Sequence, residues 1–255
     1  MRLFDSHVHL DDRRYDEDRD ELITSLPEQG IELAVNIGAD IKSSKASIDL
    51  AEKYEFLYAT VGVHPHDVKT MKDRDIDTLR ELSKHPKVLA IGEIGLDYYY
   101  DNSPRELQKR WFIEQIKLAN ECDLPIVIHS RDAVQDTYDM IKEHNNGSRV
   151  LIHCFSQSLE MAKKYVKDEA YLALGGALTF KNARSLLDVA RHIPLEYLLI
   201  ETDCPYLTPE PYRGKRNDPS KVYYVAQKIA ELKGLSLEEV VETTNLNARK
   251  FYGLS

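Results

Sequence analysis

Short runs of apolar and β-branched residues alternate along the chain with longer segments in which apolar residues recur at helical spacing. This alternation is typical of parallel βαβ units. The short runs predict eight strands, at residues 2–7, 32–38, 57–63, 88–94, 125–130, 150–155, 170–176 and 197–202. Eight β/α units favour an α/β fold of the TIM type, a (β/α)8 barrel with its active site at the carboxyl ends of the strands. An open doubly wound sheet would normally carry a glycine-rich phosphate turn after its first strand, and this sequence has none there.

Two helices have recognisable ends. Ser103, Pro104 and Glu106 predict an N-cap, a first-turn proline and a capping-box acid. Ser236 predicts the start of the last helix, and Gly253 predicts its end.

Composition narrows the class of protein. The chain has 255 residues, 42% apolar and 30% charged, without a linker, repeat or composition break, so we predict one domain over residues 1–255. The net charge of -9 argues against a protein that coats nucleic acid, but leaves room for a local basic site. Three widely spaced cysteines indicate free thiols, and no apolar run has the length of a membrane span. We therefore expect a cytoplasmic protein with no membrane association and no obligate protein partner.

Two histidines lie two residues apart at the end of the first predicted strand. Because side chains alternate along a strand, Asp5, His7 and His9 share one face. Two adjacent imidazoles are not both protonated at low cost, and a shared cation uses the neutral form of each. Further ligand types end other strands, and together the candidate ligands are His7, His9, Glu93, His129, His153 and Asp203. The carboxyl ends of barrel strands meet at one mouth, so this set predicts a metal site. Glu201 shares the inward face of Asp203 and is expected to orient a ligand.

The segments "FDSHVHLD", "GVHPH", "GEIGLDYY", "IHSRDA", "IHCFSQS" and "IETDCPYLTPEPYRGKRNDP" occur in this order over nearly the whole chain. They resemble the successive signatures of the TatD-like metal-dependent deoxyribonucleases, within the amidohydrolase superfamily. The resemblance implies a TIM barrel with two divalent metal ions per chain. It also implies a ligand set in which one ion is bound by His7, His9 and Asp203, the other by His129 and His153, and Glu93 bridges the two. The activity it implies is removal of nucleotides from the 3' end of single-stranded DNA.

The ligand set suits hydrolysis. Two neighbouring cations lower the pKa of a shared water and hold the substrate oxygen. Asp203 is the expected general base, and Glu93 is expected to act through both ions. Zinc or manganese suits four histidines with two carboxylates, whereas Mg²⁺ normally prefers oxygen ligands, although the family is associated with magnesium-supported activity. The sequence leaves Mg²⁺, Mn²⁺ and Zn²⁺ open.

Other residues near the predicted mouth suit a nucleic-acid substrate. A loop after the last strand contains cations that can contact phosphates on either side of the cleaved bond, or form an ordinary solvated loop. Tyr98, Tyr99 and Tyr100 follow Glu93 on the same rim, where their rings are expected either to stack on a nucleobase or simply to pack. His64 is expected to contact phosphate, whereas His66 is equally consistent with a turn residue. The predicted substrate contacts are His64, Tyr98, Lys181, Arg213, Lys215, Arg216 and Asn217.

Two other classes of function stay open at this point. An amidohydrolase acting on a small amide, lactone or phosphotriester would need the metal site but not the cationic loop. A non-catalytic metal-binding interaction protein would hydrolyse no ester with added metal.

Overall fold

The structure is a computed structural model that describes residues 2–255, in which strands and helices alternate. The strands are β1 (Leu3–Val8), β2 (Ile31–Asn36), β3 (Leu57–Val61), β4 (Val88–Asp97), β5 (Ile126–Arg131), β6 (Val150–Ile152), β7 (Tyr171–Leu174) and β8 (Leu198–Ile200). The α-helices are α1 (Arg19–Ser25), α2 (Ile41–Lys53), α3 (Asp73–Leu82), α4 (Arg105–Cys122), α5 (Val134–His144), α6 (Leu159–Lys167), α7 (Arg184–His192), α8 (Val222–Lys233) and α9 (Leu237–Tyr252). Short 3-10 helices are η1 (Arg13–Tyr15), η2 (Val68–Thr70), η3 (Gly176–Thr179), η4 (Leu195–Tyr197) and η5 (Pro219–Lys221). All eight predicted strands are present, and their bounds differ from the predicted ones by a few residues.

The chain divides into two compact units. Unit 1 consists of the residues up to Val35 together with Cys154–Ser255, and unit 2 is Asn36–His153. Each unit carries its own group of strands with the helices that cover them. A single domain over residues 1–255 stays a prediction.

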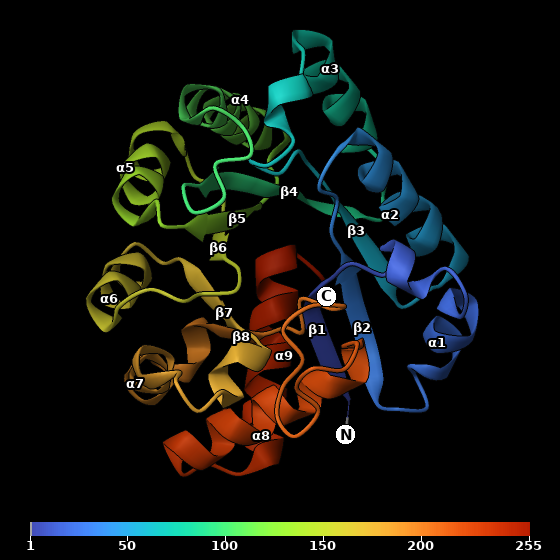
Figure 1. Cartoon of the computed structure of the whole chain (residues 1–255), viewed down its shortest axis with the longest axis vertical. Helices are drawn as coiled ribbons and strands as arrows, with labels where there is room; N and C mark the ends of the chain where they lie inside the picture. The colour runs from blue at the N-terminus through green and yellow to red at the C-terminus, as the bar shows by residue number, and fades with distance from the viewer. Residues whose placement is uncertain (1) are drawn as a thin grey trace. The chain divides into compact units, whose positions relative to one another are not determined.

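Unit 2 contains β3, β4, β5 and β6, paired in parallel in this order. Figure 1 shows α2, α3, α4 and α5 on the outer side of these strands. The strand β4 is buried along its whole length, as expected of a parallel strand covered on both faces. Its register with β5 pairs Gly95 with His129 and Asp97 with Arg131, so the carboxyl ends of these two strands lie side by side.

Gly95 is required where β4 passes β5. Its φ of +142° lies in a region that residues with a side chain rarely adopt, and a Cβ atom there would lie 2.0 Å from the backbone oxygen of His129. The glycine therefore sets how closely β4 approaches the residue that the sequence predicts as a ligand.

Unit 1 contains the neighbouring strands β7, β8, β1 and β2. β7 pairs in parallel with β8, a parallel bridge between Val8 and Cys204 joins β1 to the segment after β8, and β2 lies beside β1. The last helix, α9, is fixed to β1 by hydrogen bonds. The Tyr252 hydroxyl donates to the backbone oxygen of Ser6 at 2.8 Å, and the Asn245 side chain accepts the backbone N–H of Phe4 at 3.0 Å.

The predicted ends of the last helix are confirmed. The Ser236 side chain accepts the backbone N–H of Glu239, and Gly253 closes the helix with a positive φ of 72°. The predicted N-cap at Ser103 is wrong, because α4 begins one residue later with Pro104 at the cap position. The Ser103 hydroxyl instead donates to the backbone oxygen of His66 at 2.8 Å, a tertiary contact that the local sequence pattern does not reveal.

Candidate metal centre

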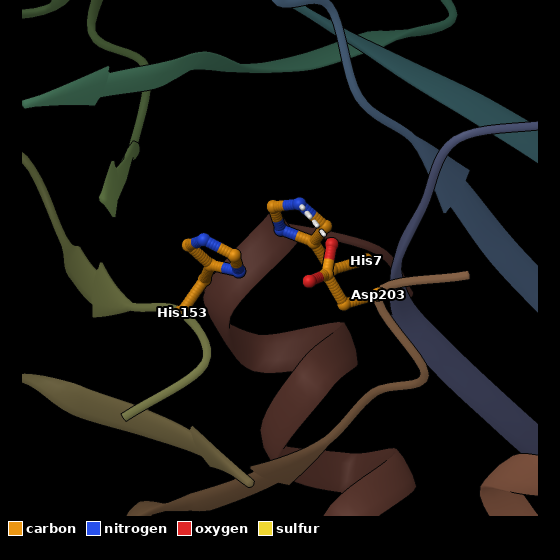
Figure 2. A group of neighbouring side chains, drawn as sticks. All are labelled: His7, His153 and Asp203. Atoms are coloured by element: carbon orange, nitrogen blue, oxygen red, sulfur yellow. Dashed lines mark ion pairs between the residues drawn. The ribbon is translucent and has the colours of Figure 1, made fainter. Parts of the chain in front are cut away.

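In unit 1, two imidazoles and one carboxylate converge where β1 ends. The Nε2 atoms of His7 and His9 lie 3.2 Å apart, and Oδ1 of Asp203 lies 3.8 Å from the first and 3.4 Å from the second. Figure 2 shows the His7 ring and the Asp203 carboxylate facing each other. Backbone hydrogen bonds fix this geometry. The N–H of Asp203 donates to the backbone oxygen of His7 at 3.0 Å, and the N–H of His9 donates to the backbone oxygen of Cys204 at 2.9 Å. Two ring nitrogens and a carboxylate oxygen so close together form a suitable set of ligands for one cation.

Buried carboxylates support this group. Asp5 accepts the Thr202 hydroxyl at 2.6 Å and the backbone N–H groups of Thr202 and His7 at 3.0 and 3.3 Å. Burial raises the pKa of Asp5 well above its usual value, although these hydrogen bonds oppose the shift. Glu201 is fully buried, and its Oε1 accepts the backbone N–H of Cys154 at 2.7 Å. Asp5 thereby fixes the backbone at His7, whereas Glu201 fixes the backbone at Cys154.

In unit 2, three imidazoles surround one oxygen of Glu93. The Oε1 atom lies 2.8 Å from Nε2 of His153, 2.9 Å from Nδ1 of His129 and 3.6 Å from Nε2 of His64. Burial by itself would raise the pKa of Glu93, but the neighbouring imidazoles lower it well below its usual value. Glu93 with His64, His129 and His153 is called the Glu93 cluster below. Ligand atoms of Glu93, His64 and His129 lie within 4.8 Å of one another, so these residues could hold a metal ion.

Asp97 is a site residue that the sequence analysis missed. It is fully buried, and its Oδ2 lies 2.9 Å from Nε2 of His66 and 3.0 Å from Nε2 of His129. Its Oδ1 accepts the backbone N–H groups of Tyr99 and Tyr100 at 3.0 and 2.8 Å. A signal was available, because Asp97 lies four residues after Glu93 and therefore on the same face of the strand.

Asp97 determines which nitrogen of His129 is available to a metal. When neutral His129 donates from Nε2 to Asp97, its lone pair is on Nδ1, the nitrogen that faces Glu93 and that a metal ion would use; without a metal, a proton on Nδ1 lets the ring donate to Glu93 as well. Burial by itself would lower the pKa of His129, but the hydrogen bonds to Asp97 and Glu93 raise it. Burial lowers the pKa of His64 well below its usual value, and the nearby His129 adds to this effect.

Two of the predicted substrate contacts are engaged within unit 1. Arg216 donates to both oxygens of Asp18, at 2.8 and 2.5 Å. Asn217 is fully buried, and its amide donates to the backbone oxygens of Thr202 at 3.1 Å and Tyr206 at 2.7 Å. These contacts fix the loop after β8, and they give Arg216 and Asn217 a structural role.

Three other predicted cations have no such partner. Within residues 2–255, no carboxylate pairs with Lys181, Arg213 or Lys215 in an ion pair. The Arg213 guanidinium lies 4.1 Å from the centre of the Phe180 ring. Tyr98, in unit 2, is engaged, because its hydroxyl donates to Asp136 at 2.7 Å and Arg105 lies 4.3 Å from the centre of its ring.

The sequence model of the family described as "TatD related DNase" matches residues 4–253. The chain belongs to this family. The protein named metal-dependent hydrolase YabD of Bacillus subtilis is 45% identical over 254 residues, which cover 99% of this chain and 100% of the relative. The metal-dependent hydrolase YcfH of Escherichia coli K12 is 35% identical over 99% of this chain and 96% of its own length.

Solved structures confirm the fold class. YjjV, a TatD homologue from Escherichia coli K12, has a TM-score of 0.92 and 28% identity, and the match covers 99% of this chain and 98% of that one. A TatD family hydrolase from Entamoeba histolytica has a TM-score of 0.91 and 26% identity over 100% of this chain and 99% of that one. The TatD-like resemblance and the predicted (β/α)8 barrel class are thus confirmed.

None of the helices formed by residues 2–255 combines the length and the apolar character that a membrane span requires. The three cysteines are free thiols. A cytoplasmic location stays a prediction.

Proposed function

We propose that this TatD-family chain is a metal-dependent deoxyribonuclease that removes nucleotides from the 3' end of single-stranded DNA. The observation that supports the proposal most strongly is that each unit carries its own group of imidazoles and carboxylates at the carboxyl ends of its strands. In the barrel class these ends open onto one mouth. His7, His9 and Asp203 are therefore proposed to hold one divalent ion and His129 and His153 a second, with Glu93 bridging.

The donor sets in both units fit divalent ions, since neutral imidazoles and carboxylates are the ligands that zinc and manganese accept in proteins. When bound, a pair of such ions supplies Lewis-acid stabilisation and an activated water. Asp203 is proposed to accept the proton of the attacking water, because its carboxylate oxygen is already among the ligand nitrogens of His7 and His9. Asp97 orients the His129 ring through its Nε2 atom, and Asp5 fixes the backbone at His7.

The proposed phosphate contacts are the cations that no carboxylate neutralises within residues 2–255. Lys181, Arg213 and Lys215 meet this condition, whereas Arg216 is already paired with Asp18. Since the chain as a whole carries a net charge of -9, we expect DNA affinity to come from such local positive charge. His64 is proposed to contact phosphate from the edge of the Glu93 cluster.

The test is hydrolysis of single-stranded DNA by the purified protein, with separate 5' and 3' end labels, with Mg²⁺, Mn²⁺ or Zn²⁺ and with chelator. We expect a ladder that shortens the 5'-labelled strand, immediate release of the 3' label, and no products with chelator. A panel of amides, lactones and phosphotriesters is run beside it. Turnover of one of these without cleavage of DNA would assign the chain to the amidohydrolase class, and no turnover at all would favour a non-catalytic role.

Charge variants test the substrate contacts. We expect the double variant Arg213→Gln with Lys215→Gln to raise KM for DNA and to reduce the salt dependence of binding by roughly one phosphate contact per residue. The matched control is Arg191→Gln with Lys228→Gln, which removes the same charge from two surface cations that pair within their own helices. Equal salt dependence in the two double variants would remove Arg213 and Lys215 from the DNA-binding surface.

A further inference from the structure

The turn after β4 exposes two tyrosine rings beside an arginine. Tyr99 is 59% exposed and Tyr100 is 53% exposed. Their rings meet edge to face, with centroids 4.9 Å apart and planes at 88°. The guanidinium carbon of Arg131 lies 4.2 Å from the centre of the Tyr99 ring and 4.7 Å from that of Tyr100. These three side chains are called the Tyr99–Tyr100–Arg131 platform.

The platform is held in place by the backbone. Asp97 accepts the N–H groups of both Tyr99 and Tyr100, and the N–H of Tyr98 donates to the backbone oxygen of Arg131 at 2.9 Å. The two tyrosines and the arginine thus sit at the ends of two paired strands. A surface fixed in this way loses little conformational freedom when a ligand binds.

The charge of Arg131 is not neutralised. Within residues 2–255 no carboxylate forms an ion pair with it, whereas Arg105, which covers Tyr98 on the same turn, is paired with Asp101 at 2.6 Å. Arg131 and the two tyrosine rings form one exposed surface. It suits a ligand that has both a flat ring and a negative charge.

The platform adjoins the Glu93 cluster. The Tyr100 ring lies 5.4 Å from that of His66, at 89°, and His66 shares the Asp97 carboxylate with His129. A ligand seated on Tyr100 would therefore lie next to the ligands proposed for one metal ion. This is where the nucleotide beside a scissile phosphate would lie.

We propose that the Tyr99–Tyr100–Arg131 platform binds a nucleobase of the substrate strand, with Arg131 contacting an adjacent phosphate. The proposal rests on the proposed nuclease function and names a binding site for its substrate. Stacking on aromatic side chains and on arginine is how proteins commonly hold single strands, independently of sequence. The sequence pattern pointed to all three tyrosines of this turn. Tyr98 is partly buried and its hydroxyl is bonded to Asp136, whereas Tyr99 and Tyr100 are more than half exposed, so these two provide the accessible rings.

The experiment compares an oligonucleotide of ordinary DNA with one that is abasic at its last two 3' positions. For the wild type we expect KM to be about tenfold or more higher on the abasic strand, because stacking one base is worth roughly a factor of 5 to 150. In the double variant Tyr99→Leu with Tyr100→Leu this difference should vanish. The variant Tyr99→Phe with Tyr100→Phe should behave as wild type, since stacking needs the ring and not the hydroxyl.

Tyr58→Leu is the matched control, because Tyr58 also lies beside a cation, with Lys87 at 4.5 Å from its ring centre, but at the start of β3. It should leave both KM values unchanged. An unaltered preference for ordinary DNA in the double leucine variant would overturn the proposal.

A binding measurement separates this proposal from the nuclease function. Chelator-treated protein is titrated against a fluorescein-labelled single strand, and the change in anisotropy gives Kd without turnover. We expect Kd to rise about tenfold or more in the double leucine variant and to stay unchanged in the double phenylalanine variant. If the wild type hydrolyses no DNA, the nuclease function fails while this titration still decides the platform. Equal Kd for the wild type and a folded leucine variant would reject the platform as a base-binding site.

Discussion

Replacing Asp97 by asparagine tests whether Asp97 orients His129 for the metal ion that it is proposed to bind. The new amide would keep the shape of the carboxylate, but one oxygen would become an NH₂ group. The remaining oxygen has to stay on the side of Tyr99 and Tyr100, because two backbone N–H groups donate there at 3.0 and 2.8 Å. The NH₂ group must then face His66 and His129. Nε2 of His129 would become an acceptor, and its proton would move to Nδ1, the nitrogen that faces Glu93.

The expected effect is on metal binding far more than on folding. Every polar group in the Asp97→Asn variant still has a partner, so we expect the free energy of unfolding to fall by only about 1–2 kcal/mol, for the loss of charge-assisted hydrogen bonds. Metal affinity should fall about 10- to 100-fold, the usual effect of changing the partner that orients a ligand histidine, which corresponds to roughly 1.4–2.7 kcal/mol.

The assay is a competitive titration of the chelated protein with Zn²⁺ or Mn²⁺ against a chromophoric chelator, with urea unfolding measured in parallel. Asp101→Asn is the matched control. Asp101 lies four residues after Asp97, its carboxylate pairs with the exposed Arg105, and asparagine tolerates its positive φ of 48°. Wild-type metal affinity in a folded Asp97→Asn variant would refute the proposed role of Asp97 and the assignment of Nδ1 as the ligand atom.

The same contacts support three further predictions. Glu93→Ala should retain at most one ion per chain by atomic emission, because the bridging carboxylate is lost, and two retained ions would contradict its assignment. The pKa of His64 is lower in the folded chain than its ordinary value of 6.5, so below pH 6.5 the unfolded chain binds more protons and stability rises with pH. The pKa of His129 is higher in the folded chain than this value, so above pH 6.5 the folded chain binds more protons and stability falls as the pH rises. The contribution of these two groups to the Tm of chelated protein should therefore peak near pH 6.5. Saturating metal should abolish the decline above that pH, since a metal ion on Nδ1 keeps the His129 imidazole neutral. An unchanged decline with metal would be inconsistent with His129 as a ligand. Gly95→Ala should lower the free energy of unfolding, measured in urea, by about 2–4 kcal/mol, because the new Cβ clashes with the backbone oxygen of His129. Gly147→Ala, also at a positive φ but with open space around it, should lower this free energy by less. Equal losses of stability would show that only the backbone angle matters.

Local pattern was sufficient for the strands and for the ligand types. Apolar runs and helical periodicity are properties of neighbouring residues, so all eight strands could be predicted to within a few residues. The same alternation placed His7 and His9 on one side of β1, and the two ring nitrogens do face each other. The order of the segments along the chain was sufficient for the family.

What only the tertiary structure decided is which side chains are already engaged. Arg216 and Lys215 are adjacent cations in one loop, and only their surroundings distinguish them, since the partner of Arg216 is Asp18, 198 residues away in the sequence. The sequence does not distinguish the three consecutive tyrosines. In the fold, Tyr98 contacts Asp136 and Arg105, whereas Tyr99 and Tyr100 are exposed. A chain's residues determine its chemical groups and their local spacing. Whether a group is left for a ligand depends on the free energy of contacts between segments that meet only when the chain folds.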